Sequence, residues 1–184
     1  MPFKKFVFAS SGWVSVLAVS LLLVSGCSRK TGDTGKSFAM GEGAKVGKLT
    51  YTVVETEWKE SLDGSLGQRL PKHRFLIVNL SIGNGGEAEL GVPFLTLIDA
   101  KGVEFREEDK ADGVASWLGY LRRVAPSETL SGRILFDVPP GGYKLRISSG
   151  GDAETETTAV VDLPYRADGL PDKADEPLAV PSTK

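Results

Sequence analysis

The apolar residues of this chain recur at every second position through most of residues 49–163. In the clearest run, residues 130–138, Ile134 and Phe136 alternate with Arg133 and Asp137. Alternate residues of a strand point to opposite faces, so this period predicts strands with one buried face. Similar runs cover residues 49–54, 75–82, 94–98, 143–148 and 157–163, with turn-forming residues between several of them. Short strands separated by turn signals predict an all-β, antiparallel β-sandwich or barrel.

The predicted strand at residues 75–82 is apolar on both faces at its start. Leu76 and Val78 share one face with Leu80, whereas Phe75 and Ile77 lie on the other. A continuous apolar run of this length is typical of a strand that is covered on both sides. The pattern therefore predicts a central position in its sheet.

The first 27 residues carry an export signal. Two lysines at positions 4 and 5 precede an apolar run at residues 13–24, and the small residues Ser25 and Gly26 follow it. This layout is typical of a secretory signal peptide. Because Cys27, the only cysteine, comes next, the segment resembles the bacterial lipoprotein signal, in which the chain is cut before an acylated thiol. We expect a lipoprotein signal peptide at residues 1–26 and membrane attachment through palmitate-type acyl chains on Cys27.

A transmembrane anchor is the competing interpretation of this segment. Its strongest apolar part, residues 16–24, is shorter than the roughly 18 residues that a spanning helix needs. The run also ends in small residues instead of a basic stop-transfer cluster. Both features favour the lipoprotein signal.

Removing residues 1–26 takes away two lysines and no acidic residue. The remaining chain has 20 basic and 24 acidic side chains, a net charge of −4. Such a chain lacks the basic footprint of nucleic-acid binding, and Arg122 with Arg123 forms only a local basic patch that we expect to be solvated. With Cys27 acylated, no thiol remains for a disulfide, so the hydrophobic core must hold the domain together.

Composition divides the rest of the chain into three parts. Residues 27–45 are polar and Gly-rich after the lipidated cysteine, which predicts a flexible tether. Residues 46–163 carry the strands of the sandwich domain. Residues 164–184 contain four prolines among acidic and small residues, which predicts a disordered tail.

Four stretches of the predicted domain resemble a known bacterial family. They are VGKLTYTV at residues 46–53, RFLIVNLSIGN at 74–84, FLTLID at 94–99 and APSETLSGRILFDVP at 125–139. The family is the extracytoplasmic domain of unknown function 4352, grouped with immunoprotective extracellular, immunoglobulin-like proteins. The resemblance spans residues 46–163 and implies an immunoglobulin-like β-sandwich behind an export signal. The family supplies no catalytic motif, so the resemblance implies a fold and not an activity.

Acidic side chains between residues 104 and 112 are the strongest candidates for a metal site. Calcium requires six or more oxygen ligands on a loop that can wrap around the ion. Lys110 and Ala111 interrupt the alternation of carboxylates that such a loop needs, so the pattern favours a solvated acidic loop over a weak calcium site. The weak metal candidates are Glu108, Asp109 and Asp112.

The chain offers no convergent set of catalytic residues. His73 is the only histidine and opens a strand between two basic residues. No Gly-x-Ser-x-Gly motif, which would place a serine nucleophile on a sharp turn, accompanies it. Residues 32–37 resemble a phosphate loop but have two residues between their glycines where four are needed. We therefore expect no enzymatic activity and no bound cofactor.

The long connection from residue 107 to residue 125 is the best candidate for an interaction loop. It carries Trp117 and Tyr120, residue types that are over-represented in binding hot spots. Gly119 and Pro126 limit any helix there to a turn or two. Two interpretations remain open, since the rings either cap the end of the sandwich or stand exposed for a partner.

Together these features predict a lipoprotein of the bacterial cell envelope, anchored to a membrane on the extracytoplasmic side. Its immunoglobulin-like domain is expected to bind an unknown envelope or extracellular partner through loops at its ends. The alternative is a structural accessory subunit of an envelope complex, which a two-sided apolar edge strand would favour because edge strands pair with partners. An enzyme or a weak calcium-binding domain is a further alternative. In a cell with two membranes, Ser28 favours the outer one, because an aspartate there retains many lipoproteins in the inner membrane.

Overall fold

The computed structural model describes residues 32–150 and 155–165. All regular secondary structure in these ranges is β-strand. In this part of the chain, no helix has the length and apolarity to cross a membrane. In chain order the strands are β1 (Gly32–Ala39), β2 (Ala44–Val46), β3 (Leu49–Lys59), β4 (Leu62–Gly64), β5 (Gly67–Arg69), β6 (Arg74–Asn84), β7 (Leu90–Val92), β8 (Thr96–Ile98), β9 (Glu104–Arg106), β10 (Arg122–Val124), β11 (Thr129–Val138), β12 (Tyr143–Ser148) and β13 (Thr157–Leu163).

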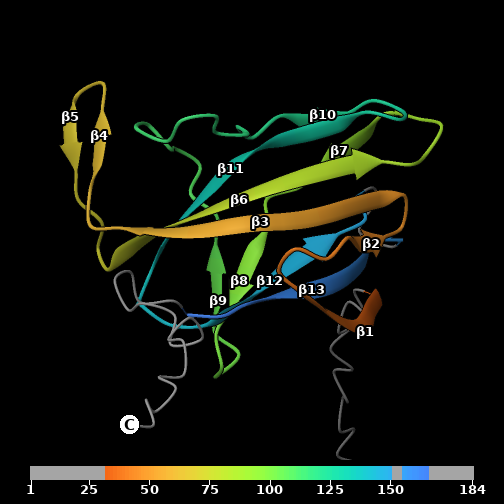
Figure 1. Ribbon diagram of the computed structural model, residues 1–184, viewed down its shortest axis with the longest axis horizontal. Helices are drawn as coiled ribbons and strands as arrows, with labels where there is room; N and C mark the ends of the chain where they lie inside the picture. The colour runs from red at the N-terminus through yellow and green to blue at the C-terminus, as the bar shows by residue number, and fades with distance from the viewer. Residues whose placement is uncertain (1–31, 151–154, 166–184) are drawn as a thin grey trace, which may run out of the picture.

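Two sheets form the layers of a sandwich (Figure 1). One has four strands in the order β11-β6-β3-β2, and the other has five in the order β1-β13-β12-β8-β9. All pairings in both sheets are antiparallel except that between β1 and β13, which is parallel. Two small ribbons, β7–β10 and β4–β5, flank the layers. The predicted all-β, antiparallel, immunoglobulin-like sandwich is confirmed.

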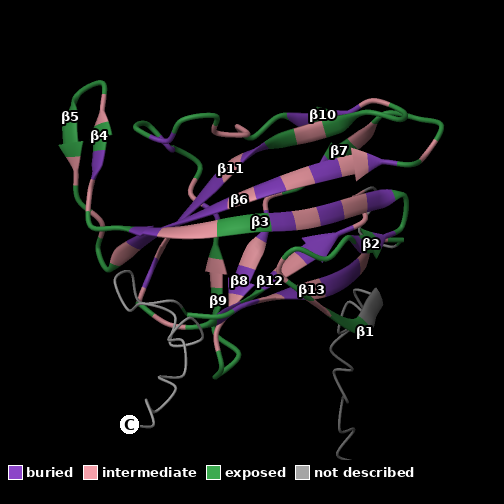
Figure 2. Ribbon diagram, viewed as in Figure 1, coloured by how far each residue is buried: buried purple, intermediate pink, exposed green. Residues whose placement is uncertain are grey.

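The central strand β6 pairs with β3 on one side and β11 on the other. It alternates between two apolar clusters, because Leu76, Val78 and Leu80 face the second sheet while Phe75 and Ile77 face outward and are also buried. The expected central position of this two-sided strand is confirmed. Figure 2 shows the resulting continuous burial at the start of β6.

The main core lies between the two sheets. Its members come from both layers at alternate positions, as the two-residue period predicts. They include Tyr51, Val53, Leu80, Ile82, Leu97, Ile134, Phe136, Val138, Leu145, Ile147 and Val161, none of which is measurably exposed.

A second, smaller apolar group lies on the outer face of the four-stranded sheet, and we call it the outer cluster. Three of its members come from β6 and β11 and the rest from the β4–β5 hairpin and the irregular chain after β9. Its buried residues are Leu62, Phe75, Ile77, Ala111, Val114 and Leu135, with Trp117 packed against them. The outer face of a sandwich is usually solvated, whereas here the hairpin and the irregular chain bury one end of that face.

The predicted tether at residues 27–45 is wrong for its second part. Residues 32–39 form the edge strand β1 beside β13, and residues 44–46 form β2 beside β3. The Ser37 hydroxyl donates to Asp162 at 2.6 Å, and Phe38 packs partly against the main core. Main-chain pairing holds this Gly-rich segment with very few apolar contacts, which is why its composition resembled a linker. The signal peptide, Cys27 and residues 166–184 of the predicted tail lie outside the described residues.

Candidate interaction surface at residues 107–124

The segment at residues 107–124, called here the side segment, runs along the outer edge of β11. The Glu108 amide donates to the Leu135 carbonyl at 2.8 Å. Further on, the Leu118 amide donates to the Arg133 carbonyl at 3.0 Å, and the Arg133 amide donates to the Ser116 carbonyl at 2.9 Å. These bonds use main-chain groups that an edge strand would otherwise leave open. The side segment therefore acts as an irregular extra strand and not as the helical turn that its sequence allowed.

A fully buried ion pair closes the side segment. Both side chains of the Glu107–Arg122 pair are 0% exposed. Arg122 Nη1 donates to Glu107 Oε2 at 3.0 Å, Nη2 donates to Oε1, and Nε donates to the Gly119 carbonyl at 2.6 Å. The Leu95 amide donates to Glu107 Oε2 at 3.2 Å, and the guanidinium carbon lies 5.3 Å from the centre of the Phe94 ring. The expectation that Glu107 and Arg122 are solvated is therefore wrong.

The electrostatics of this pair explain what it contributes. Burial raises the pKa of the Glu107 carboxyl, while the hydrogen bonds and charge of Arg122 favour its ionised form. Two charges that lose their hydration add little net stability, so a buried pair is weak evidence for a stabilising role. Its geometric effect is larger, because it joins positions 15 residues apart and fixes both ends of the side segment.

Trp117 and Tyr120 take different places in the side segment. Trp117 is partly buried against the outer cluster, and its Nε1 is buried without a hydrogen-bond partner among the described residues. Tyr120 is 63% exposed, and its ring meets Trp117 at a centroid distance of 5.9 Å and an interplanar angle of 65°. Trp117 thus covers the outer cluster, whereas Tyr120 is available for contact.

The three weak metal candidates do not converge on one point. The Glu108 carboxylate pairs with Arg69 at 2.5 Å. Asp112 accepts hydrogen bonds from the amide and the hydroxyl of Ser65, at 2.8 and 3.0 Å. Asp109 is exposed. Within the described ranges, no three His, Cys, Asp or Glu side chains are grouped so as to hold a metal ion.

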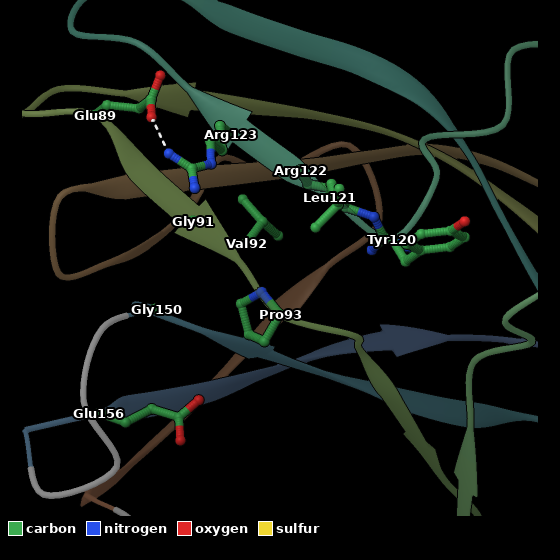
Figure 3. A pocket seen from close by; sticks show the side chains of 10 residues that line it. All are labelled: Glu89, Gly91, Val92, Pro93, Tyr120, Leu121, Arg122, Arg123, Gly150 and Glu156. Carbon is green, nitrogen blue, oxygen red and sulfur yellow. Dashed lines mark hydrogen bonds and ion pairs between the residues drawn. The ribbon is translucent and has the colours of Figure 1, made fainter.

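A first hollow of about 540 Å³ lies between the β7–β10 ribbon and the end of the β12–β13 pair. Figure 3 shows Val92, Pro93 and Leu121 on one side of it and Glu156 across from them. Arg123 stands at its rim and pairs with Glu89 at 2.9 Å. Charged and apolar residues share the walls of this hollow, and its volume is in the usual range of ligand sites.

A second hollow of about 600 Å³ lies on the other side of Tyr120. The side segment lines it from Asp109 to Tyr120, and Ser65 of the β4–β5 hairpin completes its wall. The hairpin itself projects from the sandwich (Figure 1) and exposes Leu66 fully and Leu70 to 72%. Tyr120 therefore borders both hollows.

Sequence reasoning missed Arg122, Glu107, Leu66 and Leu70. Buried charged residues in a charged stretch have the same composition as a solvated loop, so no signal distinguished that pair. The sequence did indicate a turn for the hairpin at residues 63–67, where the turn-forming residues Asp, Ser and two Gly separate short strands. His73 lies exposed at the start of β6, where its amide donates to Asp137 at 2.9 Å.

Taken together, these elements define an all-β sandwich domain with exposed apolar side chains beside one sheet edge. The chain belongs to the family described as Domain of unknown function (DUF4352), whose profile matches residues 38–158. The family expected from the sequence is thereby confirmed.

Solved structures align with this chain at low sequence identity. A functionally unknown protein from Listeria monocytogenes EGD-e aligns with a TM-score of 0.50 and 9% identity, covering 75% of this chain and 92% of its own. The yjhA protein from Bacillus subtilis aligns with a TM-score of 0.49 and 16% identity, covering 68% and 99%. MPT63, a secreted protein from Mycobacterium tuberculosis, aligns with a TM-score of 0.48 and 11% identity, covering 70% and 97%. No curated protein matches this sequence.

Proposed function

We propose that this protein is a lipid-anchored component of the bacterial cell envelope whose sandwich domain is an interaction module. Acylated Cys27 is the attachment point. The contact surface is formed by the side segment and the β4–β5 hairpin. The proposal involves no catalytic step and no cofactor.

The distribution of exposed apolar side chains carries this proposal. The described part exposes seven large hydrophobic residues. Four of them lie in the hairpin, directly after it or in the side segment, namely Leu66, Leu70, Tyr120 and Leu121. Exposed apolar residues that gather in one region mark interaction sites more often than scattered ones do. The buried Glu107–Arg122 pair holds the side segment in place before a partner arrives, so less conformational freedom is lost on binding.

The contact surface is tested by photo-crosslinking in intact cells. A photoreactive benzoylphenylalanine replaces Tyr120 in the full chain, and the same residue at Val103 is the control. Val103 is 48% exposed in the turn between β8 and β9, away from the side segment. We expect a discrete adduct from position 120 and none from position 103. Equal labelling at both positions, or none at either, contradicts the proposed surface.

Anchoring is tested separately through one sulfur atom. In Cys27→Ser a hydroxyl, a far weaker nucleophile than a thiolate, replaces the acylated group. The variant should accumulate as an uncleaved precursor without radioactive palmitate, while the wild type carries the label. A variant that is labelled as strongly as the wild type would refute the lipid anchor.

The accessory-subunit alternative gains no support from β3. Beyond Val53 this strand has no partner on the β2 side among the described strands, and a bulge lies between Val53 and Glu55. The rest of β3 carries Glu55, Glu57 and Lys59. Bulges and charges on an edge oppose pairing with another chain. The loop-borne contact surface is therefore the better basis for a function.

A further inference from the structure

The folded body begins much closer to the proposed lipid anchor than the composition suggested. Only residues 28–31 separate Cys27 from Gly32, the first residue of β1. A chain spans at most about 3.6 Å per residue, so these five steps reach no further than about 18 Å in any conformation.

β1 is fixed to the sandwich and transmits this restraint to it. Gly32 and Asp33 lie opposite Thr157 and Thr158, and after a register shift the residues from Ser37 to Ala39 lie opposite those from Val160 to Asp162. The Ser37 hydroxyl bonds to Asp162, which also pairs with Lys144 at 2.9 Å. The hydrogen bond from Ser37 and the partner Lys144 lower the pKa of Asp162, as expected for a carboxylate held in its ionised form. Rotation of β1 away from the body would break these contacts.

The start of β1 lies at one end of the sandwich, called here the anchor end. Thr157 exchanges hydrogen bonds with Ser149, whose Cβ lies 2.8 Å from the position that a Cβ on Gly47 would take. The next residue, Lys48, accepts a hydrogen bond from the Gly85 amide at 2.9 Å. The turns between β2 and β3, after β6 and after β12 therefore meet where the chain leaves toward Cys27.

The β4–β5 hairpin lies at the opposite end of the molecule. β3 starts at the anchor end with Leu49 and ends at Lys59, and its 11 residues span about 33 Å at the usual rise. The hairpin follows directly and rises from the four-stranded layer, whereas β1 is the edge of the other layer. Figure 1 shows β1 at the lower right and the hairpin at the upper left.

We infer that the anchor end is a membrane-facing surface that lies against the lipid headgroups, with the β4–β5 hairpin pointing away from the bilayer. The inference rests on the proposed acylation of Cys27. The 18 Å reach is about half the length of β3, so the tether holds one end of the body close to the lipid. Charges near that end are mixed, with Lys45 and Lys48 beside Glu87 and Glu156, so the short connection and not electrostatic attraction sets the orientation. Exposed Leu66 therefore faces the extracytoplasmic space and is not a membrane-inserting residue.

The single cysteine makes the orientation measurable. Once Cys27 is acylated, Lys48→Cys or Leu66→Cys supplies a unique thiol at an exposed position. Each purified, acylated full-length variant is labelled with a thiol-reactive fluorophore and inserted into phosphatidylcholine vesicles that carry a nitroxide on the headgroup. We expect several-fold stronger quenching at position 48 than at position 66. Equal quenching, or stronger quenching at position 66, overturns the orientation.

Two controls test separately whether the short tether causes the orientation and whether the protein is acylated. Inserting about twelve Gly and Ser residues between Arg29 and Lys30 lengthens the connection to a coil of about 20–25 Å root-mean-square span. This insertion should shrink the difference between the two labels, and an unchanged difference would refute the short tether as its cause. An absence of acyl label on the wild type defeats the proposed function, whereas acylated protein with equal quenching defeats only the orientation.

Discussion

The main core and the outer cluster share the strands β6 and β11 but differ in what covers them. On β11, Ile134 and Phe136 point into the main core, and Leu135 between them points into the outer cluster. A second sheet covers the main core. Irregular chain covers the outer cluster, since Ala111, Val114 and Trp117 come from the side segment.

This difference in cover suggests that the two apolar groups have different roles, one in folding and one in positioning the side segment. The cover of the main core is made of strands, whose inward residues follow the same two-residue period as the strands below them. The cover of the outer cluster is held by polar contacts as well, including the bond from Arg69 Nη1 to the Lys110 carbonyl at 2.6 Å and those between Ser65 and Asp112. We therefore expect the main core to decide whether the chain folds, and the outer cluster to decide where the side segment lies.

The largest effect is expected from a charge in the main core. Phe136 is 0% exposed, so Phe136→Asp buries a carboxylate without a partner. That cost is several kcal/mol, set against a typical total stability of about 5–15 kcal/mol. We expect no cooperative unfolding transition in urea. The matched control is Ser131→Asp on the same strand, whose exposed side chain should shift stability by less than about 0.5 kcal/mol. Similar melting curves for the two variants would show that the inward face is misassigned.

The buried ion pair gives the next largest effect. Glu107→Leu leaves the Arg122 guanidinium buried without its partner and should cost about 3–5 kcal/mol. The double variant Glu107→Leu with Arg122→Met removes both charges and should recover most of that loss. Urea melts of the single and double variants measure the coupling. Additive losses would mean that the two side chains act independently, and the pair would then not explain the position of the side segment.

Sequence patterns could predict the sandwich because the inward-facing residues in the strands of its main core recur at every second position. The inward positions of Ile134 and Phe136 and the two-sided burial of β6 follow from alternation alone. β1 escaped prediction because main-chain pairing to β13 holds it, and among its described side chains Phe38 is the hydrophobic one that packs against the core. The Glu107–Arg122 pair escaped for another reason, since burial of a charge depends on residues distant in sequence that no local period reveals. Trp117 and Tyr120 therefore pointed to the segment that carries the proposed contact surface, but the sequence did not predict the buried ion pair that holds this segment in place.

A smaller effect is expected from the ring that covers the outer cluster. Trp117→Ala should cost about 2 kcal/mol, about half the value for a fully buried tryptophan, because the ring is only partly buried. The loss of an indole N–H that is buried without a partner offsets part of this cost. Tyr120→Ala should cost less than about 0.5 kcal/mol while weakening partner capture at the contact surface. A Tyr120 variant as unstable as the Trp117 variant would remove the distinction between covering and contacting residues.

The smallest effect concerns calcium at the acidic residues of the side segment. An ion that binds only the folded state raises the melting temperature by mass action. Glu108 is paired with Arg69 and Asp112 caps the Ser65 turn, so both carboxylates already have partners within the protein. We expect equal melting temperatures in millimolar calcium and in a chelator, measured by differential scanning calorimetry. Asp112→Ala should lower stability by about 1 kcal/mol under both conditions, because the Ser65 amide and hydroxyl lose their acceptor. A calcium-dependent rise of several degrees that disappears in Asp112→Ala would instead show that Asp112 is a metal ligand, and that an ion helps to hold the cover of the outer cluster in place.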